Sequence, residues 1–280
     1  MNAHAPTPLT PQTPVMQRSH GDAHVGMRMV QGRVRLADLR QVGSGKAILP
    51  RVDGPVPEVV FLNTSGGLTG GDRLHYGLTL DEGCRAVATT QTAERAYLAG
   101  AGVARVDVQH RVGAGAWLDW LPQETILYQG AALERRTEID LGDGAGCLLL
   151  ETVVLGRAAM GESVTELFFR DTRLVRRAGR LALLDPLAFD DTALAAGRGV
   201  AVLGGMRAFA TLAMIGPGVQ DALAPARAAL GEDGVQAAAS AFDGKLIVRM
   251  LAADGWPLRR QVVRVLGALR GQALPRVWQN

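Results

Sequence analysis

The sequence predicts a mainly β protein with layered, stacked β-sheets, arranged as a β-helix-like sandwich, and with a few short helices, two of them near the C-terminus. Short alternating or wholly apolar runs recur along the 280-residue chain, and Gly-rich turns separate them about every 8–12 residues. Apolar residues make up 48% of the chain, enough for a sizeable core. Helical spacing is largely confined to the region after Val219. Many short strands with few helices are typical of a stacked-sheet architecture.

The N-terminal segment differs from the rest in composition. Prolines stand at positions 6, 8, 11 and 14, and no apolar segment of a secretory signal accompanies them. We expect a disordered tail over residues 1–24 and a single β domain over residues 25–280. The chain also lacks a run of about 18 uncharged apolar residues, which a membrane-spanning helix requires. We therefore expect a cytoplasmic protein with no membrane partner.

Strand-like runs follow one another through the first two thirds of the chain. The expected strands span residues 27–39, 47–49, 58–62, 74–80, 84–90, 104–112, 116–120, 125–128, 133–141, 147–155, 166–170, 174–177 and 181–184. Between them, residues 93–98 could form a single helical turn.

The last quarter of the chain combines helices with one strand. Residues 219–230 have a helical composition that Pro225 interrupts, so we expect a kink or two short helices there. A strand follows over residues 242–251. Pro257 suits the first turn of a terminal helix, in which the apolar positions from Leu258 to Leu269 recur at helical spacing. The arginines between them are expected mostly to face solvent; they are Arg259, Arg260, Arg264 and Arg270.

A glycine-rich stretch separates two of the expected strands. It reads Asn-Thr-Ser-Gly-Gly-Leu-Thr-Gly-Gly-Asp over residues 63–72. Glycine is favoured where φ is positive or where another chain segment comes close. We expect a shaped loop that fixes Asp72 towards the interior; its four glycines are Gly66, Gly67, Gly70 and Gly71. The loop is no phosphate cradle, because Asp72 and Arg73 occupy the places where a P-loop needs Lys and Ser or Thr.

Charge and side-chain chemistry exclude several other classes of protein. The net charge is only +3, and acids are interspersed among the basic residues, so the chain shows no nucleic-acid footprint. The histidines have no zinc-type spacing. Those of the expected tail, His20 among them, could gather a metal weakly or simply be solvated. Cys84 and Cys147 stand in apolar runs and are expected to be buried thiols.

Four collinear motifs resemble the urease accessory protein family UreD, also called UreH. They are residues 63–74, the segment Trp-Leu-Pro-Gln-Glu-Thr-Ile-Leu at 120–127, Gly-Arg-Ala-Ala-Met-Gly-Glu at 156–162, and Leu-Pro-Arg-Val-Trp at 274–278. The resemblance implies a non-enzymatic scaffold with layered sheets. Such a scaffold would bind apo-urease and join UreF and the GTPase UreG. It would hold no tightly bound cofactor, and Ni²⁺ would pass transiently through an internal tunnel to the urease active site.

Seven acids stand in apolar surroundings, where a carboxylate is costly unless it is paired or meets a cation. They are Asp72, Glu94, Asp119, Glu124, Glu151, Glu162 and Asp185. The simplest interpretation is that each faces solvent or pairs with an arginine. We favour a polar passage for nickel, lined by Asp72, Glu151 and Asp185, with Glu162 as a further candidate. Carboxylates can pass a divalent cation without trapping it, unlike clustered thiolates or imidazoles.

Two other functions remain open from the sequence. The first is a carbohydrate-active enzyme on a β fold, which would place two carboxylates about 5–10 Å apart in an open cleft. The second is a purely structural adaptor, in which the same acids would face solvent or form closed ion pairs.

Overall fold

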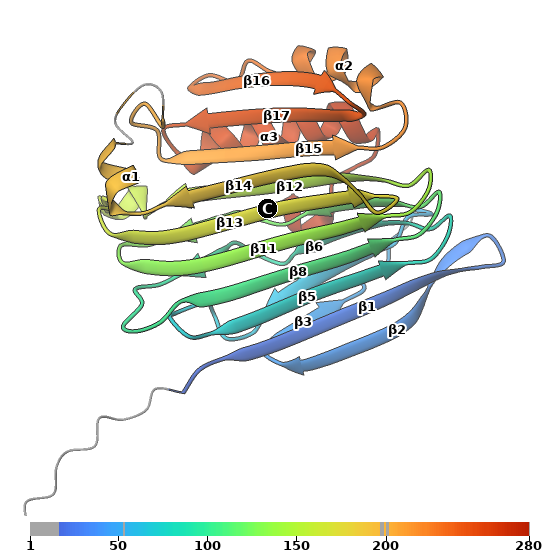
Figure 1. Cartoon of the computed structure of the whole chain (residues 1–280), viewed down its shortest axis with the longest axis horizontal. Coiled ribbons are helices and arrows are strands. Elements are labelled where there is room, and N and C mark those ends of the chain that lie inside the picture. Colours follow the sequence, from blue (N-terminus) through green and yellow to red (C-terminus); the bar gives the residue numbers. More distant parts are fainter. Residues whose placement is uncertain (1–16, 53, 197–198, 200–201, 280) are drawn as a thin grey trace, which may run out of the picture.

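The computed structural model describes residues 17–52, 54–196, 199 and 202–279. Two β-sheets face each other, and helices cover the outer face of one of them (Figure 1). The seven-stranded sheet contains, in spatial order, β14 (Arg180–Phe189), β13 (Leu167–Arg177), β11 (Ala131–Leu141), β8 (Ala104–Val112), β5 (Arg73–Leu80), β1 (His20–Val30) and β2 (Arg33–Gly43).

The ten-stranded sheet lies behind the first in this view. It contains, in spatial order, β16 (Val235–Phe242), β17 (Lys245–Ala252), β15 (Ala208–Ile215), β12 (Gly146–Leu155), β9 (Trp117–Leu121), β6 (Arg85–Thr90), β4 (Glu58–Asn63) and β3 (Gly45–Ile48). Two short strands lie off this order: β10 (Thr125–Leu127) pairs with β12, and β7 (Glu94–Ala96) pairs with β10.

The chain winds from one sheet to the other and back. Strands β5, β8, β11 and β13 pair in parallel in the first sheet, and β6, β9 and β12 do so in the second. Each turn of the winding therefore adds one strand to each sheet, as in a solenoid. This confirms the predicted stacked-sheet fold.

Two apolar cores explain the two kinds of strand pattern. Between the sheets pack large side chains such as Phe61, Trp120 and Phe169. A second core lies between the ten-stranded sheet and the helix α3 (Gly255–Arg270). Strand β8 alternates buried and exposed residues because only one of its faces is covered, whereas β12 is almost wholly buried between the two cores.

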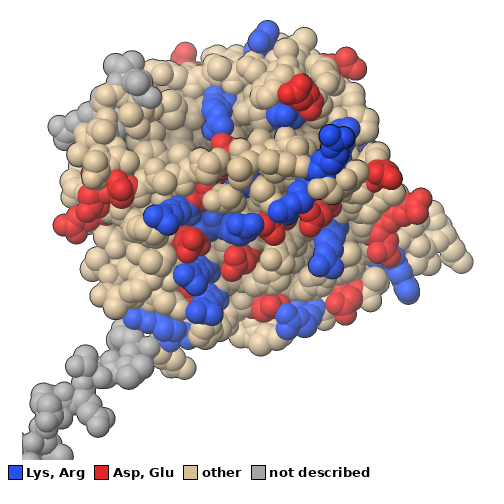
Figure 2. All heavy atoms as spheres, viewed as in Figure 1, with Lys and Arg blue, Asp and Glu red and all other residues tan. Residues whose placement is uncertain are grey.

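The outer face of the seven-stranded sheet is polar. Figure 2 shows arginines and acids interspersed over it. Cross-strand pairs such as Arg105–Glu134, at 3.3 Å, and Arg176–Asp140, at 3.8 Å, link neighbouring strands there. Opposite charges placed side by side make this a solvated face rather than a patch of one sign.

Most of the expected strands are present. The runs 166–170 and 174–177 form the single strand β13, and four further differences stand out. The run 27–39 is a hairpin, not one strand, because Gln31 and Gly32 both adopt positive φ and turn the chain. Residues 93–98 contain the strand β7 instead of a helical turn, because residues 94–96 pair with β10. Strands β15 and β16 were not predicted. The tail boundary was also wrong, since residues 20–24 belong to β1; residues 1–16 lie outside the described residues.

The helices include two short elements at the expected place. A 3-10 turn over Val219–Ala222 leads directly into α2 (Leu223–Ala228), which confirms the prediction of two short helices around Pro225. The remaining helical elements are α1 (Asp191–Ala196) and 3-10 turns at Ala158–Met160 and Arg276–Trp278. None of the helices within the described ranges is long and apolar enough to cross a membrane.

The arginines of α3 are not a uniformly solvated face. Arg270 is 3% exposed, and its Nε lies 2.7 Å from Asp119 Oδ2. Arg259 donates to Gln123 Oε1 at 2.7 Å and lies 3.3 Å from Glu124 Oε2. The expectation that these side chains face solvent was therefore wrong for both, because they contact polar groups of β9 and of the segment that follows it.

We predict that Arg270→Ala lowers the free energy of unfolding by about 2–3 kcal/mol, because it leaves the largely buried Asp119 without its cation. The matched change Arg264→Ala, at a side chain that is 46% exposed beside Glu232, should stay within about 0.5 kcal/mol. Urea denaturation of both variants measures the difference. Equal losses would contradict a buried ion pair at Arg270.

Candidate functional site

The glycine-rich loop joins β4 to β5, and each of its four glycines has a structural reason. Gly66, Gly67 and Gly71 have positive φ values of 83°, 143° and 90°, a conformation that other residues rarely adopt. Gly70 has no such φ, but a Cβ there would overlap the carbonyl oxygens of Ala101 and Gly102. The loop therefore needs glycine for conformation at three positions and for space at the fourth.

Asp72 ends this loop and is buried. Its Oδ1 accepts a hydrogen bond from the amide of Ser19 at 2.7 Å, and its Oδ2 accepts one from the amide of Thr69 at 2.9 Å. The carboxylate thus ties the loop to the segment that enters β1. Both oxygens are engaged by backbone donors, away from the other acids of the predicted passage.

Glu94, the first residue of β7, lies next to the glycine-rich loop. Its oxygens lie 3.4 and 3.5 Å from Asn63 Nδ2, which donates to them. Burial raises the pKa of the Glu94 carboxyl to about 7, although the bond from Asn63 opposes the shift. This carboxyl therefore exchanges its proton near neutral pH.

Two small cavities meet at Glu94. The outer one, of about 80 Å³, is lined by the loop residues Gly66 and Gly67 and by Asn63. The inner one, of about 40 Å³, reaches Arg135 and Glu151 between the sheets. Their shared lining residues are Tyr76, Thr90 and Glu94. A row of spaces therefore leads from the glycine-rich loop towards Glu151.

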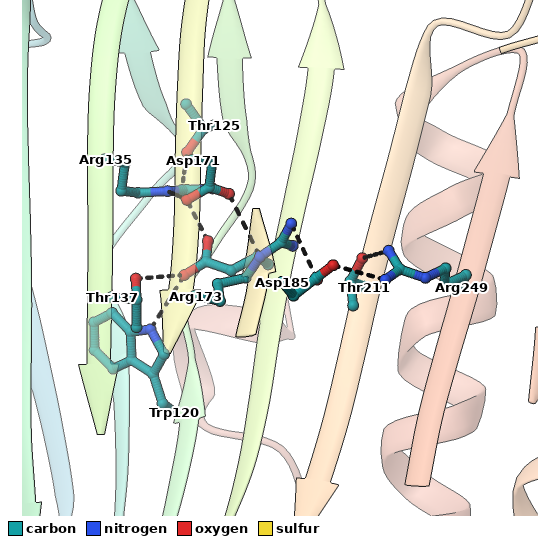
Figure 3. Close-up of polar contacts among 10 residues, drawn as sticks. Trp120, Thr125, Arg135, Thr137, Asp171, Arg173, Asp185, Thr211 and Arg249 are labelled. Carbon is teal, nitrogen blue, oxygen red and sulfur yellow. Dashed lines mark hydrogen bonds and ion pairs between the residues drawn. The ribbon is translucent and has the colours of Figure 1, made fainter. Parts of the chain in front are cut away.

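Arg135 holds two carboxylates in the interior. Its Nε and Nη2 donate to the two oxygens of Asp171 at 3.0 and 2.8 Å, while its Nη1 lies 2.8 Å from Glu151 Oε2. Nη1 also donates to Thr125 Oγ1 at 2.8 Å. The opposite oxygen of Glu151 faces Trp120 Nε1 and the hydroxyl of Thr137, each at 3.4 Å. Strands β9 to β13 thus all contribute to one buried polar cluster (Figure 3).

The cluster continues to the surface through a second and a third arginine. Arg173 lies 3.8 Å from Asp171 and 3.2 Å from Asp185. Asp185 also accepts from Arg249 Nη2 at 2.7 Å, and the Arg249 side chain is 59% exposed. Figure 3 shows this succession from β11 to β17. We call it the ion-pair chain; it consists of Glu151, Arg135, Asp171, Arg173, Asp185 and Arg249.

The two carboxyls beside Arg135 differ in how firmly they hold their charge. Burial raises the pKa of Glu151, and the single contact with Arg135 opposes this without cancelling it. Burial acts in the same direction on Asp171, but its two-point contact with Arg135 outweighs burial, so the pKa of Asp171 lies below its usual value. Glu151 is therefore the weaker partner and the one that borders the inner cavity.

The structure brings together only part of the predicted passage. Glu151 and Asp185 belong to the ion-pair chain, whereas Asp72 lies in the loop. Glu162 lies elsewhere too, 2.9 Å from Arg157 Nε, where it lines a separate open hollow of about 560 Å³. The arginine's hydrogen bonds hold the pKa of Glu162 below its usual value.

Several residues of the site escaped the sequence analysis. Arg135, Asp171 and Arg173 were not singled out, although each occupies an inward position in the alternation of its strand. Glu94 was named among the acids but was not placed in the passage. Its role depends on cavities formed by segments far apart in the chain, and no local pattern indicates them.

The cysteines and the N-terminal histidines are the other candidate metal ligands from the sequence. Cys84 and Cys147 are buried and free, as predicted. His20 and His24 lie in β1 rather than in a tail, and His24 Nε2 stands 3.3 Å from Thr79 Oγ1. Across the part of the chain that the structure describes, no group of three or more His, Cys, Asp or Glu could hold a metal ion.

Comparison with known proteins identifies close relatives. A family model described as UreD urease accessory protein matches residues 19–279. A protein named urease accessory protein UreD from Cereibacter sphaeroides is 71% identical over 272 residues, which cover 97% of this chain and 99% of the relative. Proteins of the same name from Paracoccus denitrificans and Rhizobium leguminosarum are 55% and 44% identical, over 94% of this chain and 93% and 96% of their own lengths.

We predict that Asp171→Asn lowers the free energy of unfolding by about 3 kcal/mol, because Arg135 and Arg173 then lose a shared buried partner. Asp140→Asn, at an exposed position on the neighbouring strand of the same sheet, should change it by no more than about 0.5 kcal/mol. Chemical denaturation with a single transition measures both. Similar effects at the two positions would show that the ion-pair chain does not stabilise the fold.

The raised pKa of Glu94 predicts a specific pH dependence of the free energy of unfolding. Because its pKa rises to about 7 on folding, the folded state holds this proton more tightly, and stability falls as pH rises from about 4.5 to 7. Glu94→Gln should remove this loss, so that its free energy of unfolding exceeds that of the wild type above pH 7 by up to about 2 kcal/mol. The gain stays at this level because the side chain is only partly buried. Denaturation curves at several pH values test this, with Glu134→Gln on the outer face as the control. A difference that does not vary with pH would contradict the raised pKa.

Proposed function

This chain belongs to the UreD urease accessory protein family, and we propose that it serves urease maturation as a non-enzymatic scaffold that carries nickel as cargo. In this proposal the chain binds apo-urease in the cytoplasm and joins UreF and UreG. Nickel passes through the interior of the chain towards the urease active site. GTP hydrolysis is assigned to UreG, which agrees with the glycine-rich loop of this chain, since it has Asp72 where a P-loop has lysine.

The observation that carries the proposal is the pair of cavities that meet at Glu94 and end at Glu151. Their volumes, about 80 and 40 Å³, suit a cation with a few waters, since one water occupies about 30 Å³ of the liquid. A sugar-binding site would need several hundred Å³, given that ligand pockets measure roughly 300–1,000 Å³. This argues against the carbohydrate-active alternative at these two acids.

The chemistry of the two acids favours transit over capture. Glu94 and Glu151 both have raised pKa values because of burial, so an arriving Ni²⁺ would displace a proton or a guanidinium and relieve the cost of a buried charge. Oxygen ligands, one or two at a time, bind nickel less tightly than imidazole or thiolate clusters. When the cation leaves, Arg135 forms its ion pair with Glu151 again, and the restored ion pair favours release of the cation.

Asp185 would contact nickel after Glu151 along the proposed path. It lies further along the ion-pair chain, and its partner Arg249 reaches the surface. For Asp72 and Glu162 the geometry supports an anchoring role, since each ties down a loop. A direct part for these two acids in nickel transit stays a prediction.

The closed ion pairs of Glu151 and Asp185 are also what the adaptor alternative predicts. The two functions differ in whether the charge of these acids matters to metal loading. An adaptor needs only the fold, whereas a passage needs a carboxylate at each step.

The test therefore removes charge without removing volume. We expect Glu94→Gln and Glu151→Gln to leave assembly with urease, UreF and UreG intact while causing a several-fold fall in the nickel content of the purified urease. Arg135 keeps Asp171 in the Glu151 variant, so the fold should persist. A pull-down, metal analysis and urease activity are the measurements, with Glu138→Gln on the outer face as the control. Full nickel loading by a Glu94→Gln, Glu151→Gln, Asp185→Asn triple variant would leave the adaptor function in place of the passage.

A further inference from the structure

The hairpin of β1 and β2 extends beyond the rest of the sheet. Strand β1 has its last partner in β5 where Met27 pairs with Leu80. Beyond that point, residues 28–30 pair only with residues 33–35 of β2. Figure 1 shows this ribbon projecting past the neighbouring strands. From Arg28 to Gly43 every residue except Val34 is exposed, so both faces of the ribbon are largely uncovered.

One face of the ribbon carries unpaired positive charge. Arg28 stands directly opposite Arg35, and Val30 stands opposite Arg33, so the three arginines share a face. None of them forms an ion pair within the described residues, unlike Arg40, which lies 2.6 Å from Asp22. Like charges directly opposite each other destabilise a strand pair. The isolated chain therefore retains a pair of like charges, Arg28 opposite Arg35, that destabilises its own hairpin.

The other face of β2 is apolar and incompletely covered. Leu36 and Leu39 stand opposite Met27 and Val25, which are buried in the core, yet they remain 45% and 40% exposed. The opposing sheet ends with β3, which has only four residues, so it cannot cover this face. Strand β2 is thus an amphipathic edge strand of 11 residues with no further strand beside it among the described residues.

We infer that the free edge of β2 is a docking site for an acidic, alternately apolar β-strand supplied by a protein of the urease maturation complex. The added strand would extend the seven-stranded sheet, place apolar side chains over Leu36 and Leu39, and set acids beside Arg28, Arg33 and Arg35. Strand addition to an open sheet edge is an established mode of peptide recognition. This inference rests on the proposed function for the identity of the complex.

Three other occupants fit the ribbon less well. The chain's own N-terminal segment, residues 1–16, has four prolines and no acid, and proline cannot complete a strand ladder. A second copy would bring the same arginine-rich strand against itself, with four arginines and one aspartate between residues 28 and 43. A lipid surface would engage a tip, whereas the exposed aliphatic side chains run along the whole edge to Val42.

The experiment measures hydrogen exchange of the full chain, alone and in the assembled complex with urease, UreF and UreG. We expect those amides of residues 33–43 that point to the open edge, away from β1, to exchange at least tenfold more slowly in the complex, as for a strand that gains a partner. A photo-cross-linker at Val42 should capture a segment of a partner protein that alternates acidic and apolar residues.

A charge-reversal variant tests the stated chemistry. Arg28→Glu, Arg33→Glu and Arg35→Glu together should weaken assembly roughly tenfold or more at ~50 mM salt and less at ~500 mM, because salt screens exposed charges. The matched control changes three other exposed arginines of the same sheet, Arg111, Arg170 and Arg180, to Glu and should leave assembly unchanged.

Several results would overturn the inference. Unchanged exchange at residues 33–43 in a complex that assembles and loads nickel would refute the docking site while leaving the proposed function intact. A cross-link to a second copy, or to a segment without acids, would also refute it. Sedimentation with phosphatidylserine vesicles that requires the three arginines would assign the ribbon to a lipid surface instead. Failure of the wild-type chain to join the complex would refute both proposals.

Discussion

The two sheets are held in one register by a buried charge that must be paired. Arg135 lies opposite Asp171 in the parallel ladder of β11 and β13 and faces Glu151 across the sandwich. Leaving any of these groups without its partner would cost about 3–5 kcal/mol. A slip of one residue would turn Arg135 out to solvent, leave Glu151 without this ion pair and leave Asp171 with only the more distant Arg173. The bond from Arg135 to Thr125 also places β10, and so positions the wall of the inner cavity that any cargo would meet.

Much of this structure could be predicted from local patterns, and some of the site could have been as well. Alternating strands and glycine turns indicated the stacked sheets. The same alternation puts Arg135 on the inner face with Leu133 and Ile139, and Asp171 between Phe169 and Arg173. Sequence reasoning did not single these residues out, because arginine and aspartate are seldom buried. They are buried here because each has a partner on the adjacent strand, and partners of this kind become visible only once the strands are in register.

Other features depend on tertiary context that no local pattern contains. Strand β7 has only three residues, and pairing with β10 decides its conformation over any local helical tendency. The arginines of α3 look alike in sequence, yet Arg270 is buried against Asp119 while Arg264 is largely exposed. Glu94 acquires its raised pKa from burial among segments far apart in the chain. In each case the deciding neighbour lies far away in sequence.

The contrast between the interior and the ribbon links charge to function. Between the sheets every arginine of the ion-pair chain meets an acid, because a low dielectric makes an unpaired charge costly. At the ribbon, water and salt screen Arg28, Arg33 and Arg35, so the fold tolerates them without partners at a small cost. Selection for stability alone would favour an acid opposite Arg28, where the chain has Arg35. Unpaired charge on an open apolar edge is therefore better explained by a partner that supplies the missing acids than by the requirements of this fold.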